Sequence, residues 1–161
     1  MISSVVSAQV NVNTTEAFYH VTTIDLKSIF KGHGFLPAVV NVKSQTGKWD
    51  EAGQTQTVYL SDGSYAQEQL TQYNQPNYFS YIVSNFSGAL GLLIASATGE
   101  WWFDNCDSLA NITLIRWSYT FIPKSSFAIP ILWLINQFLW SGYMRSVMEN
   151  IKAQLDTKTL T

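Results

Sequence analysis

The chain has 161 residues, of which 47% are hydrophobic and 12% are charged, and its formal net charge is −2. This length suits one hydrophobic core, so we predict a single domain over residues 1–161. The nine Lys and Arg residues form no basic stripe, which argues against nucleic acid as a partner. Cys106 is the only cysteine, which excludes an internal disulfide and a cysteine-built zinc site.

The sequence shows neither a signal peptide nor a membrane-spanning stretch. Residues 1–10 lack the basic region and the continuous apolar core of a signal peptide. The stretch 129–140 is interrupted by Asn136 and Gln137 and is shorter than the roughly 20 residues that span a bilayer. We therefore expect no transmembrane segment and a cytoplasmic protein.

The first thirty-four residues indicate one strand and two short helices. Residues 5–12 alternate between apolar and polar side chains, as a half-buried strand does. Asn13 is followed three positions later by Glu16, which resembles a capping box and predicts a helix over residues 14–21. Residues 25–30 predict a second short helix, which ends before Gly32 and Gly34.

From residue 39 onward the apolar period changes to two, which is typical of strands. Asp62-Gly63 is the strongest hairpin signal, because a type I′ turn needs positive φ at both central residues. Short connections between neighbouring strands predict an antiparallel sheet. In the last strand Ile115, Trp117 and Tyr119 share the face that we assign to the core. The six predicted strands cover residues 39–44, 54–61, 65–73, 78–85, 98–104 and 111–122.

Residues 131–155 predict one long helix with two halves of different character. From Trp140 onward, apolar residues recur on one side, as in a helix that lies on a sheet. Before Trp140 the opposite side is apolar too, so that half needs a second cover, either a dimer contact or an overlying loop. A homodimer would use Ile131, Ile135, Phe138 and Leu139.

Several stretches resemble the polyketide cyclase/dehydrase-like branch of the SRPBCC superfamily, which also includes START lipid-transfer domains and the major birch pollen allergen. The resemblance lies in residues 99–103 (GEWWF) and 116–123 (RWSYTFIP), in Asp62-Gly63 followed by Glu68, and in an alternation around Tyr81. It implies an α+β helix-grip fold, in which a curved antiparallel sheet of about seven strands wraps around the long C-terminal helix. The implied order is β-α-α-β6-α. Residues 107–111 replace a Gly-Thr pair of that branch, so we expect a longer turn there.

A sheet curled around one helix tends to leave a cavity, and polar or aromatic side chains on its concave face are candidate ligand contacts. Glu68 shares a face with Ala66 and Leu70, where desolvation favours its protonated form. It would then donate a hydrogen bond to a ligand or act as a general acid, and it is the one candidate catalytic residue. The alternative is a solvated Glu68 or one satisfied by a neighbour. The predicted ligand-binding residues are Gln56, Glu68, Tyr81, Trp117, Tyr119, Trp133 and Gln137.

The residues favour binding of an apolar or aromatic small molecule, lipid- or polyketide-like, without a cofactor. His20 and His33 have no partners at metal-ligand spacing, so we expect no metal site. One alternative is a polyketide cyclase or dehydratase, disfavoured because only Glu68 offers proton transfer. Another is a non-catalytic module that contacts a protein or membrane surface. The glycine-spaced stretch 88–92 is either a lid or a partner-facing loop.

Overall fold

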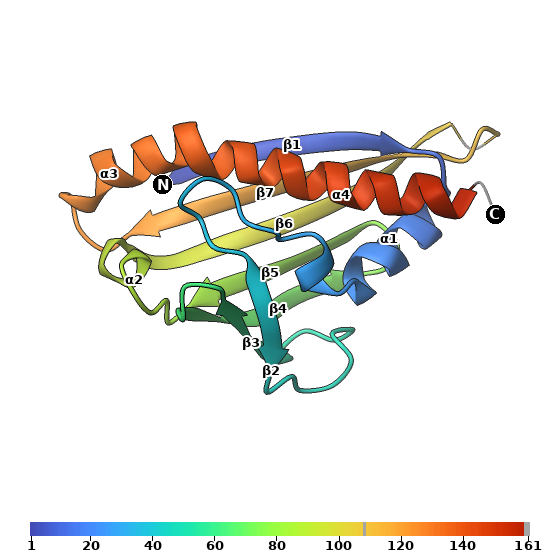
Figure 1. Ribbon diagram of the computed structural model, residues 1–161. Coiled ribbons are helices and arrows are strands. Elements are labelled where there is room, and N and C mark those ends of the chain that lie inside the picture. Colours follow the sequence, from blue (N-terminus) through green and yellow to red (C-terminus); the bar gives the residue numbers. More distant parts are fainter. Residues whose placement is uncertain (108, 160–161) are drawn as a thin grey trace.

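The computed structural model describes residues 1–107 and 109–159, and its largest element is a seven-stranded antiparallel sheet (Figure 1). The strand order is β1-β7-β6-β5-β4-β3-β2, so the first two strands of the chain form the two edges. A long C-terminal helical segment lies along the curved sheet, and short helical elements follow the first strand, which confirms the predicted helix-grip fold. The strands are β1 (Ile2–Val10), β2 (Val39–Lys43), β3 (Thr55–Leu60), β4 (Tyr65–Asn74), β5 (Tyr78–Ser84), β6 (Ile94–Asp107) and β7 (Ile112–Pro123).

The first helix begins where its cap predicts. α1 (Thr14–Thr23) starts after Asn13, whose side-chain oxygen accepts a hydrogen bond from the Glu16 amide at 2.9 Å. The second predicted helix is only a 3₁₀ turn, η1 (Leu26–Ser28). Beyond it the chain reaches the sheet edge, where the Val39 amide donates to the Phe30 carbonyl at 2.9 Å.

The β3–β4 connection is wider than the predicted type I′ turn. Gly63 is the one residue of the loop 61–64 with a positive φ, 85°. Asp62 lies outside the left-handed region, and its carboxylate accepts a hydrogen bond from the Ser64 amide at 2.9 Å. The longer turn predicted over residues 107–111 includes residue 108, which lies outside the described residues.

An aromatic stack fills the middle of the sheet's concave face. Trp117 is fully buried and stacks on Trp101 with 4.8 Å between ring centroids. Phe18 of α1 contacts Phe103 edge-on at 5.2 Å. Along β7, Ile115, Trp117 and Tyr119 are buried as predicted. Phe121 is buried on the same face, and Arg116 is exposed on the other. The stack therefore fills the middle of the groove. The remaining space lies beside it, where Val21 and Trp101 border one cavity, and toward the end that carries α2 and α3.

The C-terminal helical segment consists of α3 (Ala128–Ile135), a π-helical turn η2 (Asn136–Trp140) and α4 (Ser141–Thr159). At the turn, the Ser141 amide donates to the Asn136 carbonyl, five residues back. This wider turn shifts the buried stripe by one residue, so Leu132 and Asn136 face the sheet. The prediction that Trp133 and Gln137 face the sheet is wrong, because both are exposed. No helix within the described ranges is long and apolar enough to cross a membrane.

Candidate functional site

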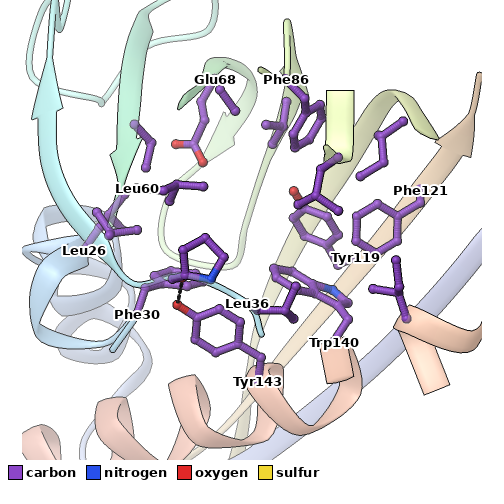
Figure 2. Close-up of a pocket in the computed structure, with 18 of the residues that line it drawn as sticks. Leu26, Phe30, Leu36, Leu60, Glu68, Phe86, Tyr119, Phe121, Trp140 and Tyr143 are labelled. Carbon is purple, nitrogen blue, oxygen red and sulfur yellow. Dashed lines mark hydrogen bonds between the residues drawn. The ribbon is translucent and has the colours of Figure 1, made fainter. Parts of the chain in front are cut away.

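A cavity of about 110 Å³ lies between the concave face of the sheet and the first half of the C-terminal helical segment (Figure 2). We call it the inner chamber. Ala66, Val83 and Phe121 contribute its sheet side, and Leu132 and Ile135 of α3 contribute its helix side. All its lining residues are buried or half-buried, and its walls are almost wholly apolar.

A loop closes one side of the inner chamber. Leu36 and Pro37 line the chamber from this loop, which runs from η1 to β2. The Tyr143 hydroxyl of α4 donates to the Pro37 carbonyl at 2.8 Å and accepts from the Gly32 amide at 3.1 Å. These two bonds hold the loop against the helix, as the dashed bond in Figure 2 illustrates for Pro37.

A second, wetter cavity of about 340 Å³ adjoins the first, and we call it the outer chamber. Exposed residues such as Gln45 and Lys48 border it, so it opens toward solvent. Gln56 and Trp49 line it as well. Four residues line both chambers and mark the junction between them: Leu26, Phe30, Glu68 and Tyr81.

Glu68 is the only acidic residue at this junction, and its carboxylate points into the cavity in Figure 2. Strand alternation places it on the concave face between Ala66 and Leu70, as predicted. Gln56, its register partner on β3, donates from Nε2 to Glu68 Oε2 at 2.7 Å. Burial nonetheless raises the pKa of Glu68 to about 7, because the cavity solvates the ionised form poorly. The carboxyl therefore exchanges a proton near neutral pH.

Two tyrosines and a tryptophan supply the other polar atoms. Burial raises the pKa of both Tyr81 and Tyr119 above its usual value, so their hydroxyls stay protonated and can donate. The Tyr81 ring lies over Gly99, where a Cβ would come within 2.2 Å of Tyr81 Cζ. Trp140 Nε1 is buried without a hydrogen-bond partner among the residues the structure describes. The cavity therefore offers several donors to a ligand that carries an acceptor.

Four of the seven predicted ligand contacts line a chamber. They are Gln56, Glu68, Tyr81 and Tyr119. Trp117 belongs to the aromatic stack and lines neither chamber. Trp133 and Gln137 lie outside on the exposed side of the helix. Sequence reasoning missed Trp140 and Tyr143, although both stand at the start of the apolar stripe that it identified.

The surface residues singled out in the sequence fall into two groups. Ile135 and Leu139 pack partly against the core, whereas Ile131 and Phe138 are exposed. Part of the stretch 88–92 is helical, in α2 (Leu90–Leu93), and Leu90 lines the inner chamber. Within the described ranges, no group of three or more His, Cys, Asp and Glu residues is placed to hold a metal ion.

Solved structures with the same fold are numerous, but sequence comparison finds nothing. No protein-family model matches the chain, and no curated protein sequence does. A protein from Nitrosospira multiformis is 13% identical, with a TM-score of 0.69 and coverage of 99% of both chains. A point mutant of norcoclaurine synthase from Thalictrum flavum, in complex with a transition-state analogue, is 10% identical; its TM-score is 0.71 and coverage is 98% of this chain and 97% of that one. Major latex-like protein 151 from Panax ginseng is 13% identical, with a TM-score of 0.62 and coverage of 96% of this chain and 99% of that one.

Proposed function

The chain has the helix-grip fold of the SRPBCC superfamily, and from that premise we propose that it binds an apolar or aromatic small molecule, lipid- or polyketide-like, between sheet and helix. The observation that supports this proposal best is the position of Glu68. Its carboxyl group borders an apolar inner chamber and a wetter outer chamber at once. A ligand with an apolar body and one polar group would satisfy both environments.

The size of the inner chamber limits what it can hold. Its volume of about 110 Å³ is smaller than the ~150 Å³ of an apolar cavity that accepts benzene. We therefore infer that a short alkyl group, or only part of an aromatic ring, occupies the inner chamber. The rest of a larger ligand would extend past Glu68 and Tyr81 into the outer chamber, whose volume is about 340 Å³.

Micromolar binding of such a ligand would need both its apolar body and its polar group to contribute to the binding free energy. Removing about 200 Å² of apolar ligand surface from water contributes roughly 5 kcal/mol before the cost of immobilisation. Micromolar affinity needs about 8 kcal/mol. Hydrogen bonds from Tyr119 or Glu68 to the ligand's polar group would supply part of the difference.

The test is whether filling the inner chamber abolishes binding. Native mass spectrometry of the purified protein would identify a co-purifying small molecule, and N-phenyl-1-naphthylamine fluorescence would measure affinity for an uncharged apolar probe. Ala66→Leu adds bulk inside the chamber, so we expect it to weaken probe binding at least tenfold. Ala95→Leu adds the same bulk at an exposed position of β6 and is the matched control. Equal affinity in both variants would contradict the proposal.

Acid–base catalysis at Glu68 is a second candidate function. Its pKa of about 7 would allow the carboxyl to donate and accept protons at neutral pH, and one structure with this fold is a norcoclaurine synthase. The specific assignment to the polyketide cyclase/dehydrase-like branch remains a prediction. Turnover of a small aromatic polyketide that is lost in Glu68→Gln, with probe binding retained, would support catalysis. Turnover that persists in this variant would count against it.

A further inference from the structure

Large apolar side chains are exposed together at one end of the molecule, the end that carries α2 and α3 in Figure 1. Phe127 is 88% exposed, Phe138 72% and Leu92 77%, while Trp133 is half exposed. Phe35, on the loop before β2, is 95% exposed. Such a concentration exceeds the scattered apolar residues of an ordinary surface.

Specific contacts bring these segments together. The Lys124 side chain, just before α3, donates to the Gly91 carbonyl in α2 at 2.6 Å, and the two helices pack against each other. The loop that carries Phe35 lies beside η2, since a Cβ at Gly34 would come within 2.9 Å of Leu139. The exposed side chains therefore belong to one continuous region, which we call the apolar end.

The charges of the apolar end have one sign. Its three segments, residues 31–38, 86–99 and 124–144, contain Lys31 and Lys124 but no Asp or Glu. The remainder of the chain holds all eleven carboxylates. Asp62 borders the loop 31–38 from outside these segments, in a surface hollow that it shares with Lys31 and Phe35. An anionic surface would therefore meet apolar side chains flanked by cations mainly on the side of α2 and α3.

The arrangement of side chains around α3 distinguishes a fluid partner from a rigid one. At about 100° per residue, Phe127, Ile131 and Leu134 point to one side of the helix. Ile129 and Trp133 lie about 140° around from them and are exposed too. A second copy of the chain would cover one side of a protruding helix. Lipid headgroups and acyl chains flow around it and cover both sides.

From these observations we infer that the apolar end inserts into the surface of an anionic lipid bilayer. Residues 127–139, apolar except for Asn136 and Gln137, span about 20 Å as a helix, so this segment lies in the interface and does not span a core of about 30 Å. Leu132 of the same helix and Leu90 of α2 line the inner chamber. The inserted surface thus continues into the cavity, although the inference does not depend on what the cavity binds.

Vesicle binding tests this inference directly. Protein would be sedimented with vesicles of phosphatidylcholine and phosphatidylserine, and with phosphatidylcholine alone. We expect Phe127→Ser with Phe138→Ser to weaken binding on the order of 10- to 100-fold. Tyr19→Ser, at an exposed aromatic residue of α1 at the other end, should leave binding unchanged. Brominated lipids should quench Trp133, and Trp133→Phe should lose that quenching.

Three results would overturn the inference. The first is wild-type protein that fails to bind or binds equally after the double substitution. The second is binding no tighter with phosphatidylserine than without it, which would contradict the anionic surface. The third is a dimer in sedimentation velocity that dissociates in the Phe127→Ser, Phe138→Ser variant, because a second copy would then cover the apolar end.

Discussion

Ionisation of Glu68 should make the stability of this protein fall between mildly acidic and mildly alkaline pH. The carboxyl lies at the junction of the two chambers, where burial raises its pKa from the ordinary 4.5 to about 7. In the unfolded chain it titrates near 4.5. The folded protein therefore holds this proton over a pH range in which the unfolded chain has already released it.

The sign and size of the effect follow from linkage. Because the folded state binds the proton more tightly, the contribution is fully present below pH 4.5 and is lost as the pH rises through about 7. The difference between these two pKa values corresponds to about 3 kcal/mol of unfolding free energy. The Gln56 hydrogen bond to Glu68 Oε2 already opposes the rise.

Chemical denaturation of the wild type and of Glu68→Gln at a series of pH values would measure how the unfolding free energy depends on ionisation of Glu68. Subtracting one stability curve from the other removes the contribution of every other titrating group. We expect the stability of wild type relative to Glu68→Gln to fall by about 3 kcal/mol from pH 4 to pH 8. Glu51→Gln, at an exposed loop position, controls for the loss of one charge.

A difference curve that stays flat over this range would refute the reasoning. It would mean that water or a neighbouring group solvates the Glu68 carboxylate as well in the folded protein as in the unfolded chain. The solvated alternative considered from the sequence would then be correct, and Glu68 would lose its role as the polar anchor of a ligand.

Two further substitutions test the packing around the cavity. Asn136→Ala should lower the unfolding free energy by about 1–3 kcal/mol, because the buried Asn136 side chain accepts a hydrogen bond from the Ser4 hydroxyl at 2.9 Å. Gln137 is the next residue and is exposed. Gln137→Ala should therefore change the unfolding free energy by less than about 0.5 kcal/mol in the same denaturation assay. Gly99→Ala should cost about 1–3 kcal/mol because its methyl group would displace the Tyr81 ring. Combining it with Tyr81→Leu should cost less than the two single changes together, and strict additivity would show that the ring is not displaced.

The parts of the fold that could be predicted are those that depend on residues close together in the sequence. Alternation in β7 assigned Trp117 and Tyr119 to the core because side chains on a strand change sides at every residue. Asn13 marked the start of α1 because its cap bond reaches only three residues along the chain. The junction residues Glu68 and Tyr81 were found on the concave face by the same reasoning.

The errors arose where distant contacts override local pattern. The π turn at residues 136–140 begins at Asn136, whose side chain bonds to Ser3 and Ser4 at the other end of the chain. The periodicity of apolar residues along the helix contains no information about such long-range bonds. The pattern therefore placed Trp133 on the side that faces the sheet, whereas it is exposed. The loop around Pro37 lines the inner chamber because Tyr143 holds it there, 106 positions away in sequence.

Because η2 contains one residue more than a regular α-helical turn, deleting a single residue there would change which side of the preceding helix faces the sheet. Deleting one residue from it would restore regular bonding and rotate everything upstream by about 100° relative to α4. Ile131 and Ile135 would then take the places of Leu132 and Asn136 against the sheet. The buried Asn136 amide would be replaced by the aliphatic side chain of Ile135, and Leu132 would turn outward. One deletion would therefore change both the helix side of the inner chamber and the exposed surface of the helix.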